Sequence, residues 1–282
     1  MKLFSYIKLL RPANMFMIAF GVGLGFWLAH AGGHLYKLAM LIVAAVCAGG
    51  FGNVVNDIAD IATDRVSHPA RPLAAGDISK SGAMVFAILC AGAAVISAFF
   101  VSWQHGAGTL VPLFLLLLYA LFFKGTPLAG NVLVSVLVAY AIIFGGLLGP
   151  DINRLFVPAV LAFLLNVPRE IIKDIQDEPG DRAAGYVTTA SLSHSALKAI
   201  IMLCGLVYAM LVIVPYVSRG FGIVYALVCL AAVAPLHIWW SMLFYKSDWR
   251  QSAGKISSLI KYEMLCGLLA LALDEAVKEF MS

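Results

Sequence analysis

Charged residues are scarce in this sequence. They make up 12% of its 282 residues, about half of the roughly 25% that soluble domains carry. Hydrophobic residues make up 62%, and the mean hydropathy is +0.94. So few charges exclude a soluble globular protein. Because a membrane-spanning helix needs roughly 20 apolar residues, about nine helices would use most of the chain and leave only short loops. We therefore expect a single transmembrane domain over residues 1–282.

Two further absences narrow the class of protein. There is no CxxC pair, and no histidine neighbours a cysteine, which argues against a zinc site or a disulfide framework. We expect the cysteines to be packing residues in apolar stretches; they are Cys47, Cys90, Cys204, Cys229 and Cys266. The N-terminal segment also lacks a short apolar core followed by a small-residue cleavage site, so we expect no cleaved signal peptide.

Long apolar runs, separated by polar residues or by Pro and Gly, make up most of the sequence. They predict an all-α, polytopic membrane protein with about nine transmembrane helices. The expected spans are 13–30, 37–57, 80–101, 108–123, 129–148, 154–175, 196–216, 221–244 and 255–273.

The basic residues divide unequally between the two sides that these spans define. Fifteen of the 19 Lys and Arg residues fall on the side of the N-terminus, and the other four are Lys37, Arg154, Arg219 and Lys278. Cytoplasmic loops carry an excess of Lys and Arg. The sequence therefore predicts a protein of the cytoplasmic membrane whose N-terminus faces the cytoplasm.

Nine of the 15 acidic residues follow the second and sixth spans, on that same side. Each segment has three aspartates at positions i, i+3 and i+7 with an arginine directly after them. The first set is Asp57, Asp60, Asp64 and Arg65, and the second is Asp174, Asp177, Asp181 and Arg182. On a helix this spacing places the three carboxylates on one face. The two sets correspond at a constant offset of 117 residues, which is consistent with duplication of a four-helix unit.

Carboxylates that share a face repel one another unless cations lie between them. Mg²⁺ favours a few carboxylates together with water and substrate phosphates, so two facing acidic segments could hold Mg²⁺ ions that bind a diphosphate. The alternative is a pair of solvated helix ends whose acids pair with nearby Lys and Arg. The matched spacing and the common membrane face favour the functional interpretation.

Basic and polar residues on the same side could complete a phosphate site. Arg71 lies in the proline-rich loop His68–Leu73, Tyr119 and Lys124 end the fourth span, and Arg11 with Asn14 begins the first. Arg suits bidentate phosphate contacts. Each of these residues could instead be an interfacial anchor.

With these motifs the sequence resembles the UbiA superfamily of intramembrane prenyltransferases over essentially its whole length. The first family motif, N-D-x-x-D-x-x-x-D, is met by Asn56, Asp57, Asp60 and Asp64, and the second, D-x-x-D-x-x-x-D, by Asp174, Asp177 and Asp181. The segments 71–73, 119–124 and 130–131 are also similar to that family. The resemblance implies a helical bundle around a central cavity that holds a prenyl chain.

Within the superfamily, segments 52–57 and 169–181 are most similar to the digeranylgeranylglyceryl phosphate synthases. Those enzymes add a second geranylgeranyl chain to geranylgeranylglyceryl phosphate and form an ether lipid. Pro179 and the segment 186–189 depart from their usual pattern without removing a candidate ligand. The runner-up is an aromatic acceptor, either a quinone precursor or chlorophyllide.

The resemblance also implies roles for individual residues. The Mg²⁺ ligands would be Asn56, Asp57, Asp60, Asp64, Asp177 and Asp181. The diphosphate would be bound by Arg71, Lys124, Arg182 and Tyr119. The acceptor would be bound by Arg11, Asn14, Arg169 and Lys173. Asp174 or Glu170 would position the acceptor hydroxyl or receive its proton. The partners would be a prenyl diphosphate donor, a lipid-phosphate or aromatic acceptor and membrane lipids, with no nucleic acid.

An ion-coupled secondary transporter is the rival from another class of protein. Its intramembrane carboxylates would be distributed towards the middle of the bilayer. Here the acidic residues gather at one rim beside basic residues, which favours the enzyme. A purely structural membrane protein would not need two matched aspartate motifs.

Overall fold

The computed structural model describes residues 2–32 and 35–281, which form helices and loops without a strand. The predicted domain of 1–282 also includes Met1, Gly33, His34 and Ser282, which lie outside the described residues. The helices of the first half are α1 (Lys2–Leu10), α2 (Pro12–Leu28), α3 (Leu35–Ala59), α4 (Ile61–Ser67), α5 (Lys80–Phe99), α6 (Trp103–Leu118), the π-helix Tyr119–Phe123 and α7 (Ala129–Gly145). Those of the second half are α8 (Phe156–Ala183), α9 (His194–Leu211), α10 (Val214–Val217), α11 (Ile223–Val228), the π-helix Cys229–Val233, α12 (Ala234–Tyr245) and α13 (Ala253–Met281). Short 3₁₀ turns at Ile152–Leu155, Thr189–Ser191 and Trp249–Ser252 precede α8, α9 and α13.

The all-α membrane architecture is confirmed, but the count of nine spans is not. Seven helical segments of the described chain are long and apolar enough to cross a membrane, and the bent pair α1 and α2 raises the number to at most eight. The pair bends by 52° because Arg11 has a φ of 56° and Pro12 begins the next helix. α7 covers the remaining predicted span with only 17 residues. At a rise of 1.5 Å per residue this is about 26 Å, slightly short of the hydrocarbon core.

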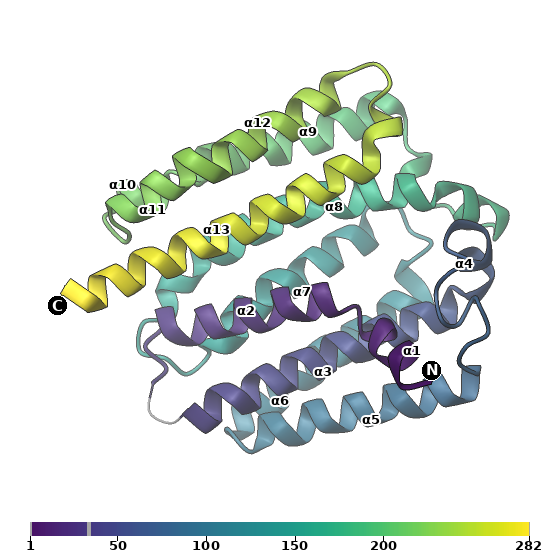
Figure 1. The fold of residues 1–282 in the computed structure, drawn as a ribbon, viewed down its shortest axis with the longest axis horizontal. Coiled ribbons are helices and arrows are strands. Elements are labelled where there is room, and N and C mark those ends of the chain that lie inside the picture. Colours follow the sequence, from purple (N-terminus) through teal and green to yellow (C-terminus); the bar gives the residue numbers. More distant parts are fainter. Residues whose placement is uncertain (1, 33–34, 282) are drawn as a thin grey trace.

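The helices lie side by side across the molecule, as Figure 1 shows. α9, α12 and α13 pack with α8 around a core that includes Ile172, Leu197, Trp240 and Ile256. On the other side, α3 packs against α5, and α7 packs between α2 and α8. α4 and the N-terminus lie at the same end of the bundle as the C-terminal part of α8, so both acidic segments reach one rim.

Glycines allow α2 and α7 to approach closely near the C-terminal ends of both helices, away from that rim. A methyl group at Gly25 would overlap the backbone carbonyl of Ile142, and one at Gly145 would overlap that of Val22. Small residues at such crossings let helix backbones pack directly against each other. The α2–α7 contact therefore depends on the absence of side chains at these two positions.

Gly25→Ala is expected to lower the unfolding midpoint of the detergent-solubilised protein, because the new methyl group meets backbone that cannot rotate away. Overpacking of this kind typically costs about 1–3 kcal/mol. Gly23→Ala, on the same helix, is the matched control because a methyl group there meets no atom within 4 Å. Its midpoint should be unchanged or higher, since Ala favours helices over Gly. Equal midpoints for the two variants would contradict the close crossing.

A buried polar cluster links the helices of the second half. Glu263 of α13 is fully buried, accepts a hydrogen bond from Trp240 Nε1 at 2.6 Å and lies 2.9 Å from His237 Nδ1. The His237 ring stacks on Tyr208 of α9, at 5.5 Å between ring centroids. A buried carboxylate is tolerated only where such partners replace its hydration.

Glu263→Ala is expected to destabilise the fold by about 3–5 kcal/mol, since it leaves the partners of a buried acid unsatisfied. The matched control is Glu178→Ala. Glu178 pairs with Arg250 at 3.0 Å, and both side chains are about one-third exposed. Losing this pair should therefore lower the free energy of unfolding by at most about 1 kcal/mol. Thermal unfolding followed by circular dichroism measures both. A Glu263 variant as stable as the control variant would show that the cluster is not structural.

Candidate active site

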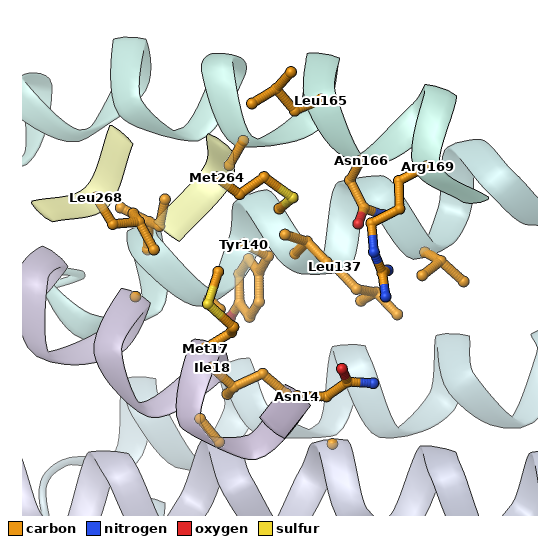
Figure 2. A pocket seen from close by; sticks show the side chains of 18 of the residues that line it. Asn14, Met17, Ile18, Leu137, Tyr140, Leu165, Asn166, Arg169, Met264 and Leu268 are labelled. Atoms are coloured by element: carbon orange, nitrogen blue, oxygen red, sulfur yellow. The ribbon is translucent and has the colours of Figure 1, made fainter. Parts of the chain in front are cut away.

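An apolar cavity of about 290 Å³ runs through the bundle between α2, α3, α6, α7, α8 and α13. Figure 2 shows Met17 and Ile18 of α2 facing Met264 and Leu268 of α13 across it. Along α8 its lining extends from Pro158 to Lys173, which is about 22 Å of helix. Its polar lining gathers at the rim, so the cavity suits a long apolar chain with a charged end. The residues of this polar end are Arg11, Asn14, Asn53, Asn56, Asn166, Arg169, Glu170, Lys173 and Lys261.

The first acidic segment lies at this rim, where α3 ends at Ala59 and α4 begins at Ile61. Asp57, Asp60 and Asp64 are only 2%, 4% and 3% exposed. The predicted helix is interrupted at Asp60, yet Asp60 N and Asp64 N still donate to the backbone oxygens of Asn56 and Asp60. The helical spacing is thus kept across the break.

A cation neutralises each of these buried carboxylates. Arg11 Nη2 lies 2.5 Å from Asp57 Oδ1, and Arg71 Nη1 lies 2.6 Å from Asp64 Oδ1 and 3.8 Å from Asp57 Oδ1. Lys124 is ion-paired with Asp60. Because Arg71 reaches both Asp57 and Asp64, these two carboxylates lie on the same side of the segment.

The second acidic segment lies within α8, which continues to Ala183 rather than ending near residue 175 as expected. Asp174 accepts a hydrogen bond from Asn131 Nδ2 at 2.9 Å, and Asp177 Oδ1 lies 2.7 Å from His68 Nε2. Asp181 is buried. The helix passes through Pro179, which the sequence marks as a departure from the usual pattern.

Gly180 brings the two acidic segments together. A methyl group there would overlap Ser67 Oγ and the backbone oxygen of Thr63, both in α4. α4 and α8 therefore touch at the glycine that immediately precedes Asp181. The pair His68–Asp177 joins the same two segments a few residues away.

Lys124 lies between the segments, at the end of a π-helical turn closed by its backbone N–H donating to Tyr119 O at 3.0 Å. Such turns occur often at functional sites. Burial lowers the pKa of the Lys124 ammonium, while the negative charges of Asp181 and Asp177 oppose that shift. Burial also raises the pKa of the Asp64 carboxyl, against the effect of Arg71. Tyr119 itself lines the cavity.

The oxygen donors at this rim fit a hard divalent cation. Five carboxylates, those of Asp57, Asp60, Asp64, Asp177 and Asp181, face three cations, Arg11, Arg71 and Lys124. Asn56 Nδ2 donates to Asp60 at 2.7 Å, but its Oδ1 atom is buried without a hydrogen-bond partner among the described residues. An excess of negative charge with an unpartnered amide oxygen is a suitable environment for Mg²⁺.

A second group of ligand atoms lies at the opposite end of the bundle. Single ligand atoms of His30, Glu275 and Glu279 lie within 4.8 Å of one another. Arg154 already forms hydrogen bonds of 2.8 and 2.6 Å with the two carboxylate oxygens of Glu275. This group therefore serves to anchor α13, and the aspartate rim is the better candidate for a metal.

Comparison with known proteins agrees with this geometry. Residues 16–263 match the UbiA prenyltransferase family. The chain belongs to that family. A protein of Methanopyrus kandleri named digeranylgeranylglyceryl phosphate synthase is 35% identical over 94% of this chain and 97% of its own length. A protein of the same name from Methanosphaera stadtmanae is 28% identical over 95% of this chain and 98% of its own length.

Solved structures share the fold of this prenyltransferase. One described for a digeranylgeranylglyceryl phosphate synthase has a TM-score of 0.77 and 25% identity, covering 97% of this chain and 98% of that one. A UbiA homologue from Archaeoglobus fulgidus, solved with GPP and Mg²⁺, has a TM-score of 0.61 and 20% identity, covering 93% of this chain and 99% of that one. The expected family, the all-α membrane fold and the class of enzyme are thereby confirmed.

The structure brings together most of the predicted site residues of the prenyltransferase. Arg11 and Asn14 at the start of α2 and Arg169 and Lys173 of α8 all line the cavity mouth, with Glu170 between the last two. Arg182 is the exception. Its side chain is exposed near the end of α8, and no hydrogen bond or ion pair links that side chain to the other site residues described.

Three residues that contact the site of the prenyltransferase were missed by sequence reasoning. His68 pairs with Asp177, Asn131 with Asp174, and Lys261 of α13 with Asn14. Asn131 lies in a segment that carries the family resemblance, and His68 begins the proline-rich loop that holds Arg71, so both lie close to predicted site residues. Lys261 lies near the start of the last helix, far along the chain from every motif.

Proposed function

We propose that this prenyltransferase moves a geranylgeranyl group from its allylic diphosphate to the free hydroxyl of geranylgeranylglyceryl phosphate. The observation that carries the proposal is the contact of the two acidic segments through Gly180 at the mouth of a long apolar cavity. The names of the most similar relatives support this choice of acceptor. The product is an ether lipid with two geranylgeranyl chains.

Mg²⁺ would be held by Asn56, Asp57, Asp60 and Asp64 on one side and by Asp177 and Asp181 on the other. When bound, it would neutralise the diphosphate and stabilise it as a leaving group. The chain's own cations act alongside it. Arg71 and Lys124 neutralise Asp64 and Asp60, and they would turn to the diphosphate when a metal takes those oxygens. Tyr119, which lines the cavity, lies one π-helical turn before Lys124. Arg182, although exposed, remains a proposed contact of the diphosphate outside the cavity.

The reaction breaks the allylic C–O bond, and the diphosphate leaves with the electron pair. The resulting allylic cation is captured by the acceptor oxygen, which forms the ether bond and loses its proton. Glu170 lines the cavity and is held by Arg169 at 2.7 Å and Lys173 at 2.8 Å. It would position the hydroxyl. Asp174, fixed by Asn131, is the proposed proton acceptor. Arg11 and Asn14 would bind the acceptor from the opposite wall.

The apolar cavity has a protective role, because water that reached the cation would convert it to an alcohol. Bulky side chains at the far end, including Phe144, Tyr225 and Leu271, are buried and close the lining there. We further propose that the protein lies in the cytoplasmic membrane with its N-terminus and this rim in the cytoplasm, as the distribution of basic residues indicates.

The test is to incubate the purified protein with geranylgeranyl diphosphate, Mg²⁺ and a panel of acceptors, and to identify products by mass spectrometry. We expect an ether product with geranylgeranylglyceryl phosphate and none with aromatic acids or chlorophyllide. Turnover of an aromatic acceptor without turnover of the lipid phosphate would overturn the proposed acceptor. No prenylated product with any acceptor would overturn the proposed function.

A further inference from the structure

The cations at the cavity mouth are not evenly matched by carboxylates. Arg11 pairs with Asp57 at 2.5 Å, so it belongs to the aspartate rim. Arg169 and Lys173 share one carboxylate, that of Glu170. Among the described residues Lys261 has no carboxylate partner, and its ammonium donates to Asn14 Oδ1 at 2.9 Å. Three cations share one directly paired carboxylate, and the only other acid known to interact with them electrostatically among the described residues is Asp174, near Lys173. An excess of positive charge therefore remains.

These three cations face one another across the mouth. Arg169 and Lys173 are one turn apart on α8, and Lys261 comes from α13, which packs along α8. Lys261 lies close enough to interact electrostatically with both of them. Figure 2 shows Arg169 and Asn14 entering the cavity from opposite walls. Like charges gathered in a half-buried mouth repel one another, which favours an anion among them.

A donor atom in this group is also unused. Arg169 Nε is buried without a hydrogen-bond partner among the described residues, although its Nη1 bonds Glu170 at 2.7 Å. Buried donors are normally satisfied, and an exception calls for an explanation such as an absent ligand. A guanidinium with free N–H groups suits a phosphate.

This cluster is separate from the cations of the proposed diphosphate site. Arg71 and Lys124 are each ion-paired with aspartates of the rim, and neither lines the cavity. The reaction needs two anionic groups bound at once, the donor diphosphate and the acceptor phosphate. A phosphate monoester carries about −1.5 to −2 charges near neutral pH, so the excess positive charge of the second cluster would attract it.

We infer that Lys261, Arg169 and Lys173 form a second anion site, which binds the phosphate monoester head group of a lipid acceptor whose apolar chain enters the cavity. This inference rests on the proposed function and extends it: Lys261 is a specificity residue that selects acceptors with an anionic head group. Asn14 holds the Lys261 ammonium towards the mouth.

The test compares wild type with Lys261→Gln, Lys261→Arg and the matched control Lys255→Gln. Lys255 lies on the same helix, is exposed and packs over the Trp239 ring, outside the cavity. Binding is measured without donor, using geranylgeranylglyceryl phosphate, the uncharged geranylgeranylglycerol and inorganic phosphate. We expect wild type to bind the lipid phosphate more tightly than the uncharged lipid. Lys261→Gln should weaken binding of the lipid phosphate by about 10- to 100-fold. Lys261→Arg and Lys255→Gln should keep the preference.

Binding of the uncharged lipid and the KM for geranylgeranyl diphosphate should be unchanged in Lys261→Gln. Equal binding of the lipid phosphate by wild type and Lys261→Gln would overturn the inference, as would an equal loss of both lipids. Inorganic phosphate that binds as tightly as the lipid phosphate would overturn the lipid source of the anion. If the proposed function is wrong, the result differs: wild type still binds the lipid phosphate more tightly than the uncharged lipid, but no ether product forms.

Discussion

Asp60→Ala and Asp177→Ala are each expected to lower kcat by about 10³-fold or more, since each removes a proposed ligand of the Mg²⁺ that would stabilise the departing diphosphate. Asp60 lies in the first acidic segment, ion-paired with Lys124, and Asp177 lies in the second, paired with His68. If both segments hold the same metal–diphosphate group, neither can replace the other. Product formation under saturating donor and acceptor measures the loss.

The matched control for this experiment is Asp77→Ala. Asp77 follows α4 on the same side of the membrane, but it is exposed, and its nearest described partner is Ser5 at 3.4 Å. Its activity should be that of wild type. Because Asp60→Ala leaves Lys124 without its counter-ion, Asp60→Asn is tested beside it, and thermal unfolding confirms that each variant is folded. Wild-type activity in a folded variant of either Asp60 or Asp177 would refute the metal assignment.

Removal of divalent cations is expected to stop turnover completely. Five carboxylates at the rim exceed three cations before any substrate arrives, and a diphosphate adds further negative charge. Without Mg²⁺ the donor is expected neither to bind well nor to ionise, because a few positive side chains cannot neutralise both sets of charges. Treatment with EDTA followed by gel filtration, and then activity measurements over a Mg²⁺ titration, provides the test.

The control for chelation is EDTA saturated with Mg²⁺ before it is added, which should leave activity unchanged. Excess Mg²⁺ should restore the activity of the metal-depleted protein, which would show that EDTA did not unfold it. Turnover that persists in the metal-free protein at the wild-type rate would mean that the side-chain cations act alone and that the aspartates are their structural partners.

The local features of this protein could be predicted from the sequence. The membrane class follows from the scarcity of charge, and the one-sided placement of acids and bases follows from spacing along apolar runs. The placement of the aspartates at i, i+3 and i+7 on one face needs only helical geometry. The second aspartate set lies within α8 and the first keeps helical hydrogen bonding across Asp60, so each set retains the spacing on which that prediction depended.

Features that depend on packing between distant segments could not be predicted. α8 continues through Pro179, next to the glycine at which α4 packs against it. The bend at Arg11 depends on a positive φ that residue type alone does not indicate. The pairs His68–Asp177 and Lys261–Asn14 join residues 109 and 247 positions apart. Periodicity along one helix carries no information about such partners, so the second anion site becomes visible only in the folded chain.

We expect the two acidic segments to act together in holding Mg²⁺ and the donor diphosphate. This is tested by the affinity for a non-ionisable thio-analogue of geranylgeranyl diphosphate, with and without Mg²⁺, in wild type, Asp60→Asn, Asp177→Asn and Asp77→Asn. Mg²⁺ should tighten binding strongly in wild type and Asp77→Asn, and either site variant should lose this effect. Donor binding that is independent of Mg²⁺ in wild type, or a full Mg²⁺ effect in Asp177→Asn, would contradict this expectation.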